Sequence, residues 1–136
     1  MEIYAKEYML YATDEHQKKI TATPRSKGIC PICKANVVSK CGEINIWHWA
    51  HQAKIDCDNW HEPETEWHLK WKSLFPKESV EVTMGENNQH RADILTENGV
   101  VIELQHSSIS SSEIRKREEF YGGKMLWVID GTEFVN

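Results

Sequence analysis

Two short motifs limit how the first half of the chain can fold. Cys30 and Cys33 are separated by two residues, and His48 and His51, further along, repeat that spacing. Two thiolates and two imidazoles are a complete tetrahedral ligand set for Zn²⁺. The fourteen residues between the two pairs are enough for a short hairpin that returns the chain to one ion. The spacing therefore predicts a zinc site that ties four points of the chain together.

Two other cysteines compete for a place in this site. Cys57 is the stronger rival for a ligand position, and Cys41 is the weaker one. Disulfides are the alternative use of four cysteines in a small secreted chain, but charged residues interrupt every apolar run at the N-terminus, unlike in a signal peptide. A site closed by four protein ligands has no open position for catalysis, so we interpret the predicted zinc as structural.

The length and composition of the chain suit one domain or two small ones. Its 136 residues are 40% hydrophobic and 10% aromatic, enough for a real core, and no apolar stretch approaches the length of a membrane span. We expect a soluble, cytoplasmic protein with no membrane partner. Alternating apolar and polar residues predict a hairpin or a pair of strands over 3–23, and a later change of pattern suggests two parts, 1–60 and 61–136.

The second part has the pattern of a mixed α/β arrangement. Apolar residues recur at helical spacing from residue 64 to the next proline, and later segments alternate as strands do. Asn98-Gly99 is a strong hairpin signal between two of these strands, and Ser110 can cap a helix that ends at Gly122. The expected order is helix, strand, strand, strand, helix, strand, over residues 64–75, 79–84, 90–95, 100–104, 111–121 and 124–130.

Acidic side chains fall at unusual places in these strands. Because side chains alternate along a strand, Glu103 and Gln105 share one face of an otherwise apolar segment. A hairpin that turns at Asn98-Gly99 would bring Asp93 beside Glu103 on the neighbouring strand. Mg²⁺ and Mn²⁺ prefer hard oxygen ligands, so this acidic pair is a candidate site for either ion.

A polar stripe on the preceding helix could complete the acidic site. Glu64, His68 and Lys72 recur every four residues and would therefore occupy one helical face. Taken singly, each of these residues is more often part of a solvated face, but together with the acidic strand pair they point to catalysis. We expect a divalent metal at this site to activate water and to stabilise the charge of phosphodiester cleavage.

These motifs together resemble the competence protein CoiA-like family. The resemblance runs from about Gly28 to Asp130 and includes the strings CPIC, HWAH, PETEWHLKWKSLF, HRADIL, VVIELQHSS and MLWVID. Members of the family are regarded as having a zinc-binding N-terminal part and a nuclease domain of the PD-(D/E)XK type. The resemblance implies a restriction-endonuclease-like α-β-β-β-α-β core, an α/β (α+β, mixed-sheet) fold, beside a small β-rich zinc-binding subdomain.

The resemblance also assigns roles to individual residues. It implies that the two strand acids bind the catalytic metal and that Glu64 is the acid of the helix. Gln105 stands where most members of the wider superfamily have lysine, so Lys72 or His68 would have to supply the missing charge. The residues expected to contact the substrate are His90, Arg91, Ser107, Arg117 and Tyr121.

The expected activity is metal-dependent nuclease action on nucleic acid, most readily on DNA. One alternative is a catalytically degenerate nucleic-acid-binding zinc module, because residues 16–40 contain six lysines and arginines and no acid. A second is a protein-binding adaptor or inhibitor of mobile-element origin, which the net charge of −5 leaves open. A third is a ββα-metal nuclease centred on WHWAH, with His48 or His51 as general base, but both histidines are needed as zinc ligands unless Cys41 or Cys57 takes the place of one of them.

Overall fold

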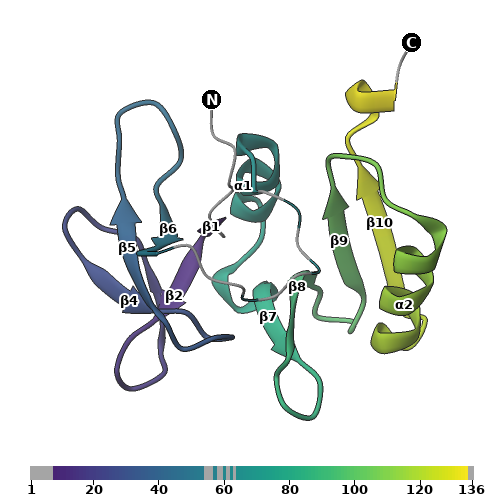
Figure 1. The fold of residues 1–136 in the computed structure, drawn as a ribbon, viewed down its shortest axis with the longest axis horizontal. Coiled ribbons are helices and arrows are strands. Elements are labelled where there is room, and N and C mark those ends of the chain that lie inside the picture. The colour runs from purple at the N-terminus through teal and green to yellow at the C-terminus, as the bar shows by residue number, and fades with distance from the viewer. Residues whose placement is uncertain (1–7, 54–56, 58–59, 61, 63, 135–136) are drawn as a thin grey trace.

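Short antiparallel strands fill the first part of the chain, where apolar and polar residues alternate. The computed structural model describes residues 8–53, 57, 60, 62 and 64–134 (Figure 1). Strands of this part form one sheet in the order β1-β6-β5-β4-β2-β3. Their bounds are β1 Tyr8–Met9, β2 Tyr11–Thr13, β3 Lys19–Thr21, β4 Lys27–Ile29, β5 Asn36–Lys40 and β6 His48–His51. The hairpin predicted within 3–23 is confirmed as the pair β2–β3, and residues 1–7 lie outside the described residues.

One tryptophan organises the core of this sheet. Trp49 on β6 is fully buried and packs in one apolar cluster with Met9 and Val37. Its indole lies against Gly28 on β4, where a Cβ would sit 3.3 Å from a ring carbon of Trp49 and 2.9 Å from the Cβ of Ala12. Gly28 therefore leaves the space into which the tryptophan packs.

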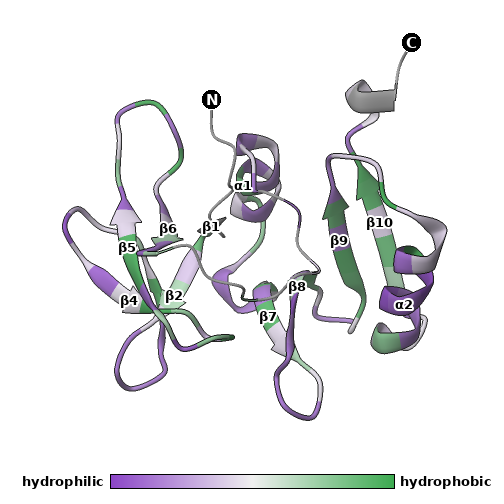
Figure 2. Cartoon of the chain, in the orientation of Figure 1, coloured by the Kyte–Doolittle hydropathy of each residue, from purple (hydrophilic) through white to green (hydrophobic). Residues whose placement is uncertain are grey.

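A second sheet follows, with strands in the order β10-β9-β8-β7. β9 and β10 are parallel and joined by helix α2, whereas the other neighbours are antiparallel. The bounds are α1 Glu66–Ser73, η1 Lys77–Ser79, β7 Val80–Met84, β8 His90–Leu95, β9 Val101–Gln105, α2 Ser111–Tyr121, β10 Met125–Ile129 and η2 Gly131–Phe134. The predicted order of elements and the mixed α/β class are therefore confirmed. Figure 2 shows β10 as a largely hydrophobic strand, β9 as a hydrophobic strand interrupted by hydrophilic positions, and α2 as a largely hydrophilic helix beside them.

Local turn chemistry places several element ends where the sequence predicts them. In the turn between β8 and β9, Gly99 has φ 79° and its N–H donates to the Thr96 carbonyl at 2.9 Å. Helix α2 begins after Ser110, whose hydroxyl accepts the Glu113 backbone N–H at 3.2 Å. It ends at Gly122, which has a left-handed φ of 75°. Among the described residues, no helix is long and apolar enough to cross a membrane.

Helix α1 is shorter than predicted, which changes the place of Glu64. Thr65 caps the helix: its hydroxyl accepts the His68 N–H at 3.4 Å, and its own N–H donates to His68 Nδ1 at 3.0 Å. This reciprocal capping starts the helix at Glu66. Glu64 therefore lies in the preceding segment and not on the helical face expected for it, whereas His68 and Lys72 do lie on α1.

The two sheets are joined through α1 and β7. Leu10, next to β1, is buried together with Leu69 on α1 and Val80 on β7. Lys19 Nζ on β3 donates to the carbonyl oxygen of Lys77 at 2.9 Å and also to that of Val80. In Figure 1, α1 accordingly lies between the two sheets, and α2 lies beside β10 on the far side.

Replacing Gly28 with alanine is expected to destabilise the protein by about 1–3 kcal/mol. The added methyl group must displace Ala12 or Trp49, and both are buried. Gly42→Ala is the matched control, since a Cβ at Gly42 meets nothing within 4 Å. Urea unfolding measures the difference, and equal stability of the two variants would contradict this packing.

Candidate functional site

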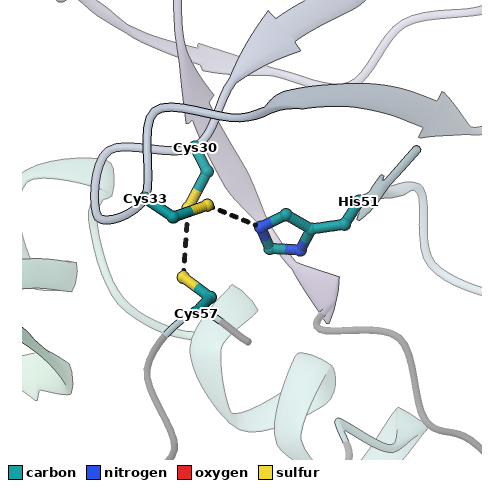
Figure 3. Close-up of side chains that lie close together, drawn as sticks. All are labelled: Cys30, Cys33, His51 and Cys57. Atoms are coloured by element: carbon teal, nitrogen blue, oxygen red, sulfur yellow. Dashed lines mark hydrogen bonds between the residues drawn. The ribbon is translucent and has the colours of Figure 1, made fainter. Parts of the chain in front are cut away.

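Three cysteines and one histidine converge at the ends of β4 and β6 (Figure 3). Cys30 and Cys33 lie at the turn after β4, His51 is the last residue of β6, and Cys57 belongs to the segment that follows. One ligand atom from each of them lies within 4.8 Å of the others. Cys30 Sγ and Cys57 Sγ are 3.6 Å apart, and Cys33 Sγ and His51 Nε2 are 3.3 Å apart. We call this set the Cys3His cluster.

These spacings fit a tetrahedral zinc ion. With Zn–S bonds of about 2.3 Å and a Zn–N bond of about 2.0 Å, the ligand atoms of a tetrahedron are about 3.5–3.8 Å apart. Contact with Cys57 lowers the pKa of Cys30, which favours the ionised form of this thiol that binds metals. Burial raises the pKa of Cys33, a thiol that a bound metal would deprotonate. The Cys3His cluster can therefore bind zinc.

The turn that carries the cysteine pair depends on a residue with left-handed backbone. Lys34 has φ 65°, and its N–H donates to the Cys30 carbonyl at 2.9 Å. The Cys30 N–H in turn donates to the Ala35 carbonyl at 2.9 Å. These bonds reverse the chain tightly, which brings Cys33 back beside Cys30.

The structure corrects one predicted zinc ligand. His48 and His51 are three residues apart on β6, and because side chains alternate along a strand they point to opposite faces. The His48 ring instead lies beside Ile46, with Nδ1 2.8 Å from its carbonyl oxygen. Cys57, the stronger of the two rivals, takes the fourth position in the cluster, and Cys41 packs against the apolar core.

The acidic pair of the second sheet lies where two strands separate. β8 and β9 pair through their backbones at two positions next to their turn. Further along, Glu103 Oε2 accepts the Asp93 N–H at 3.0 Å, and Asp93 Oδ2 accepts the Leu104 N–H at 2.8 Å. Both acids are buried, with 3% of Asp93 and 1% of Glu103 exposed. The hairpin thus brings the two carboxylates together as the sequence predicts.

Lys72 is completely buried among carboxylates. Its Nζ atom lies 2.5 Å from Glu64 Oε1, 2.9 Å from Glu81 Oε2 and 3.6 Å from Asp93 Oδ1. Burial by itself would lower the pKa of Lys72, but these carboxylates outweigh it and raise that pKa above its ordinary value. The ammonium group is therefore charged, and it stands beside Asp93.

Glu62 is a site residue that the sequence did not reveal. Its carboxylate accepts hydrogen bonds from the His68 ring at 2.8 Å and from the Gln105 amide at 3.3 Å. It also accepts the Ser107 N–H at 2.9 Å, the Ser107 hydroxyl at 2.5 Å and the His106 N–H. Burial would raise the pKa of Glu62, but these donors outweigh it and lower that pKa to about 2. Glu62 therefore fastens the loop after β9 to helix α1.

His68 connects Glu62 to the helix. Because His68 Nδ1 accepts the Thr65 N–H, its ring proton lies on Nε2, which donates to Glu62 at 2.8 Å. The side chain is buried, with 2% exposed. Both ring nitrogens are occupied within the protein, which favours a positioning role over the catalytic role predicted for His68.

A cavity of about 420 Å³ opens between the loop after β9 and helix α2. Gln105, Ser107, Arg117 and Trp60 are among the residues that line it. Arg117 is 8% exposed, and its guanidinium lies 3.9 Å from Glu103 Oε1. The cavity therefore adjoins the acidic pair, and two of the predicted substrate contacts, Ser107 and Arg117, lie on its wall.

The other predicted substrate contacts, His90, Arg91 and Tyr121, are not among the residues that line the cavity. The His90 ring stacks on Trp60 with 3.4 Å between ring centroids, and Tyr121 meets the same indole edge-on. Arg91 is 1% exposed and Tyr121 is 9% exposed. His90 and Tyr121 thus support the Trp60 wall of the cavity, and the burial of Arg91 argues against the direct phosphate contact predicted for it.

A buried acidic pair beside a buried lysine on a mixed sheet, next to a cluster that can bind zinc, suits a nuclease-like protein with a metal-binding N-terminal part. The family model for the competence protein CoiA, N-terminal domain, matches residues 12–59, and that for its nuclease-like domain matches residues 64–136. The chain therefore belongs to the competence protein CoiA family, as its motifs indicate. Comparisons with curated proteins and with solved structures give no match.

Purified protein is expected to contain about one zinc ion per chain. Cys57→Ser should weaken zinc binding by more than about tenfold, because even indirect partners of metal ligands contribute that much. His48→Ala is the control and should retain its zinc, since His48 lies outside the Cys3His cluster. Elemental analysis and chelator competition measure both effects, and equal loss in the two variants would contradict the corrected ligand set.

Glu62→Gln is expected to lower the free energy of unfolding at neutral pH by about 1–3 kcal/mol, because charge-assisted hydrogen bonds to the loop are weakened. The folded-state pKa of Glu62 is depressed to about 2, so its contribution is present above the unfolded value near 4.5 and is lost as the pH falls toward 2. The difference from wild type should shrink over that range. Glu97→Gln, in the exposed turn before β9, is the control, and a pH-independent difference for Glu62→Gln would contradict the expectation.

Proposed function

We propose that the chain is a metal-dependent nuclease that hydrolyses phosphodiester bonds of nucleic acid, most readily of DNA. The observation that carries the proposal is the acidic pair, in which Asp93 and Glu103 are buried on neighbouring strands and bonded to each other's strand. Membership of a family with a nuclease-like domain supports it. The reaction would take place where β8 and β9 separate.

The residues around the acidic pair fit a Mg²⁺ or Mn²⁺ ion. Such ions are commonly held by one or two carboxylates and keep several waters, so two acids are sufficient. One oxygen of each acid accepts a backbone N–H. The other oxygen of each acid, Asp93 Oδ1 or Glu103 Oε1, is the atom that would coordinate the ion. Glu64 is a third acid in the same network, through Lys72. When bound, the ion would polarise the phosphate and lower the pKa of a bound water.

Lys72 is proposed to supply the charge that a lysine at position 105 would otherwise supply. Its ammonium lies 3.6 Å from Asp93 Oδ1, so it can stabilise negative charge that develops on a phosphate held there. Gln105 donates to the Ser107 carbonyl at 2.9 Å and to Glu62, which fixes its amide at the cavity wall. From that position its carbonyl oxygen can orient a water molecule.

The cavity beside α2 is the proposed place for the nucleic-acid backbone. Lys116 and Arg117 supply cations along it, and Ser107 supplies a hydroxyl, the donor types that bind phosphate oxygens. Arg117 lies between the cavity and Glu103 and so links the bound strand to the acidic pair. Binding of this kind weakens as salt concentration rises, because it releases counterions.

We further propose that the zinc is structural and that the protein acts in the cytoplasm without a membrane partner. The four members of the Cys3His cluster complete a tetrahedral set, which leaves no open position for substrate.

A division of the chain into parts 1–60 and 61–136 is supported by the family matches, which end at residue 59 and begin again at residue 64.

Wild-type protein is expected to cleave plasmid DNA in the presence of Mg²⁺ or Mn²⁺. Asp93→Asn and Glu103→Gln should each lower the cleavage rate by about a hundredfold or more, because each removes a charged ligand from the reaction centre. Glu97→Gln, an exposed acid in the turn between β8 and β9, should cleave at the wild-type rate.

Two outcomes would contradict the nuclease proposal. Wild-type protein that cuts no DNA or RNA but shifts nucleic acid in a gel at moderate salt would be a binding module that has lost catalysis. Wild-type protein that neither cuts nor binds would favour the adaptor or inhibitor. Equal cleavage by wild type and both acid variants would move the active site away from Asp93 and Glu103.

A further inference from the structure

Glu81 adopts a backbone conformation that is unusual for its place in a strand. It lies within β7, between Val80 and Val82, which pair with Ile94 and Ala92 of β8. Its φ is 53°, in the left-handed region that residues other than glycine rarely adopt. The side chain is buried, with 3% of the residue exposed. A conformation that costs energy at a buried position is retained only where the surrounding contacts determine it.

The contacts of Glu81 explain this conformation. Glu81 Oε2 accepts the Leu10 N–H at 2.7 Å and the Lys72 ammonium at 2.9 Å, and Oε1 accepts the Tyr11 N–H at 3.0 Å. Hydrogen bonds to a charged group are about twice as strong as neutral ones. Burial by itself would raise the pKa of Glu81, but Lys72 and the other groups around it lower that pKa, so the carboxylate is charged. Glu81 therefore joins the Lys72 ammonium to the backbone of the first sheet.

The two backbone donors lie between strands that lead to the Cys3His cluster. Met9 on β1 pairs with Trp49 on β6, the strand that ends at His51. Thr13 on β2 pairs with Ile29, the last residue of β4 before Cys30. The Leu10–Tyr11 segment is thus held on both sides by strands whose ends carry metal ligands.

We propose that Glu81 is a positioning residue for the proposed nuclease reaction: it holds the Lys72 ammonium beside Asp93, and the zinc-bearing sheet holds Glu81. This inference rests on the proposed function. It gives the N-terminal part a direct role in the proposed reaction, because the two N–H groups that orient Glu81 belong to that part. The nuclease-like domain completes its own reaction centre only when the first sheet is docked on β7.

The test uses the full chain and compares Glu81→Gln with wild type. The charged groups around Lys72 are Glu64 from the segment before α1, Glu81 from β7, and Asp93 and Arg91 from β8. Loss of this carboxylate removes the contact that holds the Lys72 ammonium beside Asp93, so kcat per folded molecule should fall by about tenfold or more. KM should change little, since Glu81 is not among the residues that line the substrate cavity. Glu78→Gln, an exposed acid just before β7, is the control and should leave kcat unchanged.

Glu81→Asp serves if Glu81→Gln does not fold. It keeps the charge but is too short to reach the Leu10 and Tyr11 N–H groups and Lys72 together, so its kcat should fall by a smaller factor. A variant that merely folds less well would show a smaller folded fraction by circular dichroism and a wild-type kcat per folded molecule. A wild-type kcat per folded molecule in the folded variants would overturn the proposal.

A second readout separates this inference from the nuclease proposal. Hydrogen exchange of the Leu10 and Tyr11 amides can be followed by NMR in the full chain without substrate, in wild type and in Glu81→Gln. Faster exchange at these two amides in the variant, with other amides unchanged, together with an inactive wild type would support the contact made by Glu81 and reject the nuclease. Unchanged exchange at both amides together with an active wild type would reject the role of Glu81 and leave the nuclease proposal standing.

Discussion

The ammonium group of Lys72 holds carboxylates from three separate parts of the chain at one buried point. Glu64 precedes α1, Glu81 lies on β7 and Asp93 lies on β8. Removal of one partner from a buried ion pair typically destabilises a protein by about 3–5 kcal/mol, because the remaining charge is left unpaired in a poorly solvated place. The network is therefore stable only with its members together, and this requirement fixes α1 against the second sheet and β7 against the first.

The need to keep these buried charges paired also explains why β8 and β9 separate. Asp93 stays turned inward because Lys72 lies beside one carboxylate oxygen and the Leu104 N–H bonds the other. The Asp93 N–H then bonds the side chain of Glu103, whose second oxygen faces Arg117. Bonds from side chain to backbone thus replace the backbone ladder. Two buried acids so close together would repel one another, and Lys72 beside Asp93 and Arg117 beside Glu103 offset that repulsion.

The parts of the fold that could be predicted from sequence depend on local chemistry. Strand β8 and helix α2 begin and end at the predicted residues, because the turn that contains Gly99 follows β8, and Ser110 and Gly122 cap the two ends of α2. His48 was misplaced for a reason that is also local: a two-residue gap between histidines suits a loop or a helix, but residues 48–51 form a strand. Glu62 and Glu81 could not be found in this way. Their partners are distant in the chain, as with Leu10, which is 71 residues from Glu81.

In the proposed reaction centre, the positive charge comes from elements of the fold other than β9, the strand that carries Gln105. A lysine at this position would extend from β9 toward Glu62, which now accepts the Gln105 amide, and the two would form an ion pair. In that ion pair Glu62 would lose its hydrogen bonds to the backbone N–H groups of the loop after β9. With glutamine in place, Glu62 keeps those bonds, and positive charge reaches the acidic pair through Lys72 on α1 and Arg117 on α2. The glutamine is therefore compatible with the proposed reaction, since the cation stands on the Asp93 side and Gln105 holds the wall of the cavity.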